Sequence, residues 1–192
     1  MNFLGHLYLS GDEPLVIVGN FMADAVKGRD LDRFDPDVQR GIRMHRTIDV
    51  FTDQHPITLA GRERLREHTG KYAGVALDVF YDHVIAANWQ ELHPEPLPVF
   101  AQRMYALLQD HAHLMPLRTR DMLPYMVRYD WLTSYAQVDG IGRALHGLSR
   151  RVPAGAALQD AEQVLQRYYT EYRTEGLAFL REMERHLLNA AS

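Results

Sequence analysis

Carboxylate and imidazole side chains recur at helical spacing within apolar stretches of this chain. In the segment GIRMHRTIDVFTD, His45, Asp49 and Asp53 follow one another at i, i+4 and i+8. A helix of ~3.6 residues per turn points these three side chains the same way. Ile48 and Phe51 lie among them, so the polar stripe runs beside an apolar face. A carboxylate close to a core is costly unless it is paired, hydrogen-bonded or bound to a metal ion.

Two further segments repeat this pattern. Asn20 and Asp24 are i, i+4 within LVIVGNFMADAV, and Asp78 and Asp82 are i, i+4 within VALDVFYDHVI. Because helical bundles build sites from inward side chains on facing helices, we expect the three segments to meet at one place.

Oxygen ligands combined with one or two imidazoles are typical of sites for Mn²⁺, Mg²⁺ or Fe²⁺. The predicted ligands are drawn from six residues: Asp24, His45, Asp49, Asp78, Asp82 and His83. An ion there would lower the pKa of a bound water and screen charge on a phosphoryl group. Two alternatives stay open: a purely structural network of buried ions, and a helix-capping role for Asp53. His6 is either a hydrogen-bonded core residue or part of the site.

Basic residues gather in the same part of the chain: Lys27, Arg29, Arg40, Arg43 and Arg46. Arginine can bind phosphate through two parallel hydrogen bonds. The formal net charge is −4, so an anionic partner has to meet a local patch rather than the molecule as a whole. For Arg29 and Arg40, a solvated face balanced by nearby aspartates is an equal alternative.

The periodicity predicts a single all-α domain, a helical bundle over residues 1–192 with no strand. Asp12 with Pro14, and Asp35 with Pro36, pair a capping residue with an early proline, which indicates two helix starts. Residues 71–89 are apolar nearly all round, which predicts a central buried helix. Later helical patterns cover residues 99–110, 117–132, 134–148 and 157–188.

Composition narrows the possible functions. Hydrophobic residues make up 46% of 192 residues, enough for one domain with a substantial core. The absence of cysteine excludes disulfides and thiol nucleophiles and fits the cytoplasm. No signal-peptide pattern and no apolar run of ~20 residues is present, so we expect no membrane partner. Phosphate-loop, nucleophile-elbow and dinucleotide fingerprints are also missing, and we expect no nucleic-acid partner.

Four blocks give the chain a resemblance to a known family. In order they are MNFLGHL, GNFMAD, MHRTIDVFTD and LDVFYDH, within residues 1–83. With these blocks the chain resembles the acyl carrier protein phosphodiesterases, regarded as a divergent branch of the all-α, HD-domain metal phosphohydrolases. The resemblance covers most of the chain and is densest up to about residue 89. It implies Mn²⁺-dependent removal of 4′-phosphopantetheine from holo acyl carrier protein, leaving the apo form.

The implied reaction gives roles to particular residues. Asp24 would help to hold the metal ion. A water activated at this ion would attack the phosphorus and expel the serine oxygen of the carrier protein. Arg46 or Arg43 would stabilise the phosphoryl charge, and His6 or His83 would protonate the leaving oxygen. Lys27, Arg40 and Arg43 would bind the acidic carrier protein.

The chain departs from the HD pattern in one respect. HD enzymes carry adjacent His-Asp, whereas here the order is Asp82-His83. Neighbouring helical residues diverge by ~100°, so both need not reach one ion. Two other functions stay open: a metal phosphohydrolase of nucleotides or other small phosphodiesters, and a non-catalytic helical module that binds acyl carrier protein.

Overall fold

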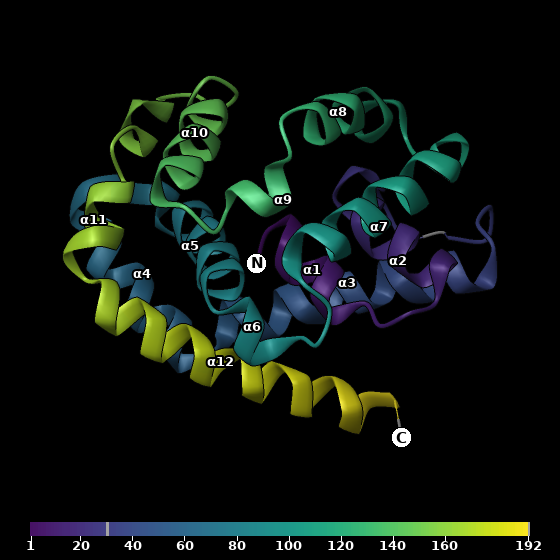
Figure 1. Ribbon diagram of the computed structural model, residues 1–192, viewed down its shortest axis with the longest axis horizontal. Coiled ribbons are helices and arrows are strands. Elements are labelled where there is room, and N and C mark those ends of the chain that lie inside the picture. Colours follow the sequence, from purple (N-terminus) through teal and green to yellow (C-terminus); the bar gives the residue numbers. More distant parts are fainter. Residues whose placement is uncertain (30, 192) are drawn as a thin grey trace.

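The described part of the protein is all-α, as predicted. The computed structural model describes residues 1–29 and 31–191, and no strand occurs in them (Figure 1). The elements are α1 (Phe3–Leu9), α2 (Pro14–Met22), η1 (Ala23–Ala25), α3 (Pro36–Gln54), α4 (Pro56–Thr69), η2 (Gly70–Tyr72), α5 (Ala73–Ala87), α6 (Trp89–Leu92), α7 (Leu97–Asp110), η3 (Ala112–Leu114), α8 (Leu117–Arg128), α9 (Trp131–Ser134), α10 (Val138–Ser149), η4 (Gly155–Leu158), α11 (Glu162–Arg167) and α12 (Tyr169–Ala191). None of these helices is both long enough and apolar enough to cross a membrane.

The starts of α2, α3 and α4 test the predicted caps. Asp35 caps α3 as expected, because its carboxylate accepts the N–H of Asp37 at 2.9 Å. Asp12 does not cap α2, which begins at Pro14 directly after Glu13. The capping role for Asp53 is also wrong, because α3 runs through it to Gln54.

His55 takes the capping role at the start of α4. Pro56 occupies the first position of the helix and favours extended backbone at the residue before it. The extended His55 ends α3, and its Nδ1 accepts the N–H of Ile57 at 3.3 Å. The residue that caps α4 is therefore His55, two residues beyond Asp53.

Helices α2 and α3 touch along their backbones. A Cβ atom at Gly19 would lie 2.2 Å from the carbonyl oxygen of Val38, and one at Gly41 would lie 2.1 Å from that of Val16. No other residue fits at either glycine without moving a helix. This close approach brings the end of α2, with Asn20, against the middle of α3, with His45.

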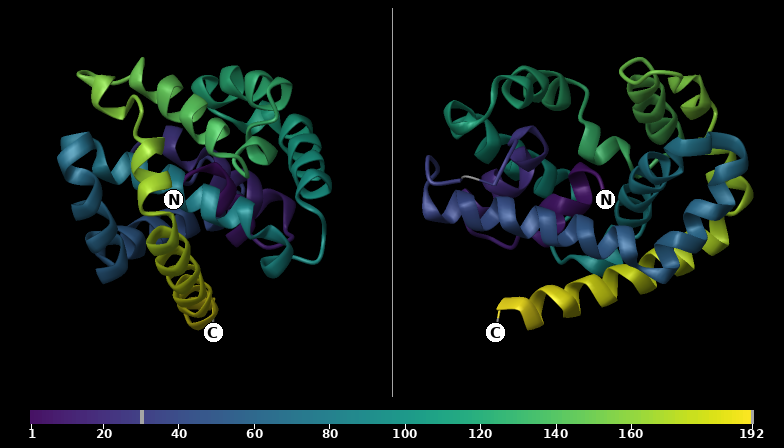
Figure 2. Two further views of the ribbon diagram at one scale, coloured as in Figure 1. Left: turned by 60° about the vertical axis from the view of Figure 1, so that its left-hand side comes forward. Right: turned by 180° about the vertical axis from the view of Figure 1, so that it is seen from behind.

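Helix α5 occupies the centre of the molecule, as its apolar pattern predicts. It contacts α1, α4, α10 and α12, and α12 runs along the side of the molecule next to α4 (Figures 1 and 2). The buried hydrophobic side chains of the described residues join into one core cluster around it.

Two long helical patterns are interrupted in the folded chain. The pattern over residues 117–132 divides into α8 and α9 because Asp130 adopts left-handed backbone with φ 42°. Its carboxylate accepts the hydroxyl of Tyr105 at 3.0 Å, and the same hydroxyl oxygen accepts the N–H of Leu132 at 2.9 Å. The pattern over residues 157–188 likewise divides into η4, α11 and α12. The break at Asp130 involves contacts with a residue distant in sequence, which the local pattern does not encode.

Candidate metal centre

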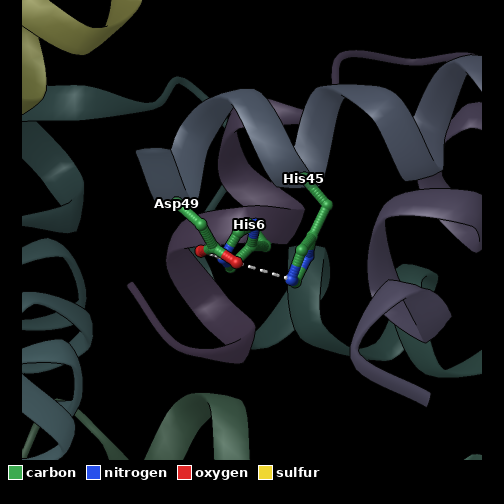
Figure 3. A group of neighbouring side chains, drawn as sticks. All are labelled: His6, His45 and Asp49. Atoms are coloured by element: carbon green, nitrogen blue, oxygen red, sulfur yellow. Dashed lines mark ion pairs between the residues drawn. The ribbon is translucent and has the colours of Figure 1, made fainter. Parts of the chain in front are cut away.

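Two imidazoles contact the same amide oxygen in the buried region where α1, α2 and α3 pack together. His6 of α1 and His45 of α3 stack with ring centroids 4.0 Å apart and 17° between the planes. Asn20 Oδ1 lies 2.9 Å from His6 Nδ1 and 3.1 Å from His45 Nδ1. All three side chains are buried. Figure 3 shows both rings beside Asp49.

The hydrogen bonds around Asn20 fix which ring nitrogens carry protons. Asn20 Nδ2 donates to the carbonyl oxygen of His6 at 3.1 Å and to Ser10 Oγ at 2.8 Å, so Oδ1 is the acceptor. Both Nδ1 atoms must then donate to it, and each neutral imidazole keeps a lone pair on Nε2. A histidine that binds a metal through one nitrogen normally donates from the other in this way.

Both Nε2 atoms face the carboxylate of Asp49. The distance is 3.3 Å from His6 Nε2 to Oδ1 and 3.1 Å from His45 Nε2 to Oδ2. Ligand atoms of these three residues all lie within 4.8 Å of one another. His6 Nε2 is buried and has no properly directed hydrogen bond within the described structure. Two inward lone pairs beside a carboxylate fit a divalent ion, because the ion would satisfy all of them.

A small cavity opens beside this group and gathers the other carboxylates. Its volume is about 190 Å³, and the residues lining it include Asp24, Asp53 and Asp78. Asp24 Oδ1 lies 3.1 Å from His45 Nε2, and the Asp24 side chain is 82% exposed. Asp78 Oδ1 accepts the Met1 ammonium at 3.1 Å. The cavity therefore presents oxygen ligands from η1, α3 and α5 on one side of the imidazoles.

Without a metal ion, His45 carries the positive charge of this group. Burial by itself lowers its pKa, but the hydrogen bonds with Asp24 and Asp49 outweigh it and raise the pKa to about 9. Burial lowers the pKa of His6, and the neighbouring charge on His45 lowers it further. Burial by itself raises the pKa of Asp49, but the hydrogen bond and the charge of His45 outweigh it and hold that pKa below its usual range. In the metal-free protein, the proton on His45 therefore supplies the positive charge that a bound metal ion would supply next to Asp24 and Asp49.

Asp82 and His83, also predicted as ligands, make different contacts. Asp82 accepts the backbone N–H groups of Asn2, Leu4 and Gly5 at 2.8–3.2 Å, so both of its oxygens hold the start of α1. His83 Nδ1 lies 2.8 Å from the carbonyl oxygen of Tyr135. As expected for adjacent helical residues, the two side chains diverge, and neither lines the small cavity.

The predicted phosphate-binding and docking residues lie around α3. Arg46 donates to the backbone carbonyl of Gly28 at 2.8 Å and so supports the loop that follows Asp24. Arg40 pairs with Glu13 and Asp37, and Arg43 donates to Gln39 at 2.7 Å. Lys27 is exposed.

Sequence reasoning missed two contributions to the centre. Asn20 was noticed only as a polar residue at helical spacing from Asp24, not as the acceptor that both imidazoles share. For His6 the sequence predicts either a core hydrogen-bonding role or proton transfer in the site, whereas in the structure its Nε2 lies beside that of His45, facing Asp49. The available signal was an amide in the wholly apolar segment around Asn20, since a buried amide needs hydrogen-bond partners.

Comparisons with known proteins identify the family of this chain. The sequence model of the family described as acyl carrier protein phosphodiesterase matches residues 1–183. A protein of that name from Photorhabdus laumondii is 34% identical over 173 residues, covering 90% of this chain and 87% of its own. Relatives of the same name from Serratia proteamaculans and Shigella boydii are 35% and 36% identical, each covering 95% of both chains. No solved structure matches the chain. With the family match spanning nearly its whole length, this chain belongs to the acyl carrier protein phosphodiesterase family.

Proposed function

We propose that this protein hydrolyses the phosphodiester linking 4′-phosphopantetheine to a serine of holo acyl carrier protein, and that it does so with a divalent ion, preferably Mn²⁺. The substrate follows from the name of the family and of its relatives. The observation that supports the metal is the pair of Nε2 lone pairs directed at Asp49, with both imidazoles oriented by Asn20. Imidazoles with carboxylates favour Mn²⁺ or Fe²⁺ over Mg²⁺, which prefers oxygen ligands alone.

His6, His45 and Asp49 would hold the ion. When bound, it supplies a water of lowered pKa and positive charge for the phosphoryl oxygens. The role of His6 as leaving-group acid gives way to ligation here, because its Nδ1 is engaged by Asn20 and its Nε2 faces Asp49.

Asp24 is placed to take the proton of the attacking water. Its carboxylate lines the cavity, is largely exposed, and lies against His45. A bond forms between the water oxygen and phosphorus while the bond from phosphorus to the serine oxygen breaks. The water proton passes to Asp24, and the serine oxygen takes a proton from solvent at the open side of the cavity. Asp78 adds a further carboxylate to the wall and holds the Met1 ammonium.

The test is the intact mass of holo acyl carrier protein before and after incubation with the enzyme. We expect loss of 4′-phosphopantetheine, no reaction after chelation, and recovery on adding Mn²⁺. The Asp49→Asn variant should be inactive under the same conditions. An unchanged carrier protein together with cleavage of small phosphodiesters would favour the small-substrate phosphohydrolase. Binding of the carrier protein without any hydrolysis would favour the non-catalytic module.

A further inference from the structure

A second, larger cleft adjoins the candidate metal centre. It has a volume of about 740 Å³ and shares Asp53 and Asp78 with the small cavity. Its other charged residues are Arg62, Arg66 and Lys71. The cleft therefore leads from a cationic surface to the carboxylates beside the imidazoles.

The fold places the three cations at the junction of α4, η2 and α5. Arg62 and Arg66 lie one turn apart on α4, and Gly70 ends that helix with φ 54°, which puts Lys71 beside them. The guanidinium of Arg62 lies against α5 where there is no side chain, since a Cβ at Gly74 would come within 3.3–3.5 Å of it. Arg62 Nε is buried and has no hydrogen-bond partner among the described residues.

The cations of this cleft are only partly neutralised. Arg62 pairs with Asp53. Arg66 pairs with Glu63 at 3.1 Å, but the two side chains are 67% and 71% exposed, and such pairs contribute only ~0–1 kcal/mol. No carboxylate lies within ion-pair distance of Lys71 in the described part of the chain; its Nζ lies over the ring of Tyr72. Arg66 and Lys71 are therefore available to an external anion, in a protein whose net charge is −4.

We propose that the cleft lined by Arg62, Arg66 and Lys71 docks a carboxylate-rich face of the acyl carrier protein, so that its phosphodiester reaches the adjoining cavity. This inference rests on the proposed function. A protein face suits these charges better than the prosthetic arm does, because pantetheine is neutral beyond its phosphate. Of the docking residues predicted from the sequence, Arg40 is less free, since it already contacts Glu13 and Asp37.

Charge reversal at the rim of the cleft tests this surface. The double variant Arg66→Glu/Lys71→Glu should raise KM for holo acyl carrier protein about tenfold and leave kcat within about twofold, because rim charges act on encounter. It should also lose most of the salt dependence of kcat/KM. The matched control is Arg118→Glu/Arg120→Glu on α8, a helix that contacts α7 and α9 and lies far from α4 (Figure 1). The control should keep the wild-type KM.

Binding of apo acyl carrier protein, measured by titration calorimetry, separates docking from catalysis. It should weaken about tenfold in the Arg66→Glu/Lys71→Glu variant, with an unchanged melting temperature showing that the variant is folded. Equal losses in the α8 control would overturn the proposal. An unchanged KM of the Arg66→Glu/Lys71→Glu variant, with a wild-type enzyme that cleaves the carrier, would overturn it as well. An equal loss of affinity for free 4′-phosphopantetheine would assign the cleft to the prosthetic arm instead. A wild-type protein that neither binds nor cleaves the carrier overturns the proposed function and the docking surface together.

Discussion

The stacked rings of His6 and His45 cannot both be cationic. Two unit charges about 4 Å apart repel by ~4 kcal/mol at the effective dielectric constant of a protein site. Burial and the charge on His45 keep His6 neutral, while Asp24 and Asp49 hold the proton on His45. A divalent ion that replaces this proton would neutralise the facing carboxylates and engage both Nε2 atoms.

Asn20 should control metal affinity without touching the metal. The Asn20→Ala variant removes the acceptor that fixes both imidazoles, and we expect Mn²⁺ affinity to fall ~10–100-fold. Calorimetric titration of the metal-free protein measures this directly. The control is Ser10→Ala, which removes a partner of Nδ2 but leaves Oδ1 in place. Wild-type affinity in Asn20→Ala would show that the imidazoles do not bind the ion.

Asp49 and Asp78 should differ in their effects. Asp49 faces both Nε2 atoms, whereas Asp78 lies across the cavity and contacts Met1. We expect Asp49→Asn to abolish measurable Mn²⁺ binding, and Asp78→Asn to lower affinity by ~10-fold or less. Metal content after gel filtration, determined by elemental analysis, provides the comparison. If Asp78→Asn lowers Mn²⁺ affinity more than Asp49→Asn does, the ion binds nearer to α5 than proposed.

The stability of the metal-free protein should fall as pH rises from about 6.5 to 9, whereas the stabilisation by a bound metal ion should increase over the same range. The pKa of His45 is raised to about 9, so its contribution to the metal-free protein is complete below the unfolded value near 6.5 and is lost as pH rises through 9. The loss is at most ~3 kcal/mol. Metal binding requires the unprotonated ring, so stabilisation by a divalent ion should grow over the same interval.

Thermal melting with and without Mn²⁺, at several pH values across this range, checks the sign. The metal-free His45→Asn variant should lose the slope, whereas His68→Asn, at an exposed position, should keep it. A metal effect that does not vary with pH would argue against ligation by His45.

Asp82 should act through the position of α1. Its two oxygens accept three backbone N–H groups from the start of that helix, which carries His6. In Asp82→Asn an amide group replaces one acceptor oxygen and faces those donors, and we expect a loss of about 1–3 kcal/mol in unfolding free energy. Urea unfolding of the metal-free protein gives the value. An equally stable variant with no metal binding would instead make Asp82 a ligand.

Sequence periodicity alone determined a substantial part of this protein. The all-α fold, the central apolar helix and the alignment of His45 with Asp49 on one face of α3 follow from local spacing, because a helix repeats every ~3.6 residues whatever surrounds it. The Asp35 cap followed from local chemistry as well. The resemblance to the family rests separately on short sequence blocks, which lie on α1, the α2–η1 region, α3 and α5.

Only the tertiary structure decided which of the polar residues meet. The contact of Asn20 with His45 depends on Gly19 and Gly41, which allow α2 and α3 to approach at backbone distance. Asp82 faces the start of α1, and Arg62 lies in a cleft beside the centre. A one-dimensional pattern gives the face of a helix but not the neighbouring helix that covers it. That neighbour is set by packing between segments distant in sequence, and here it determines whether an aspartate faces a cavity or a row of backbone amides.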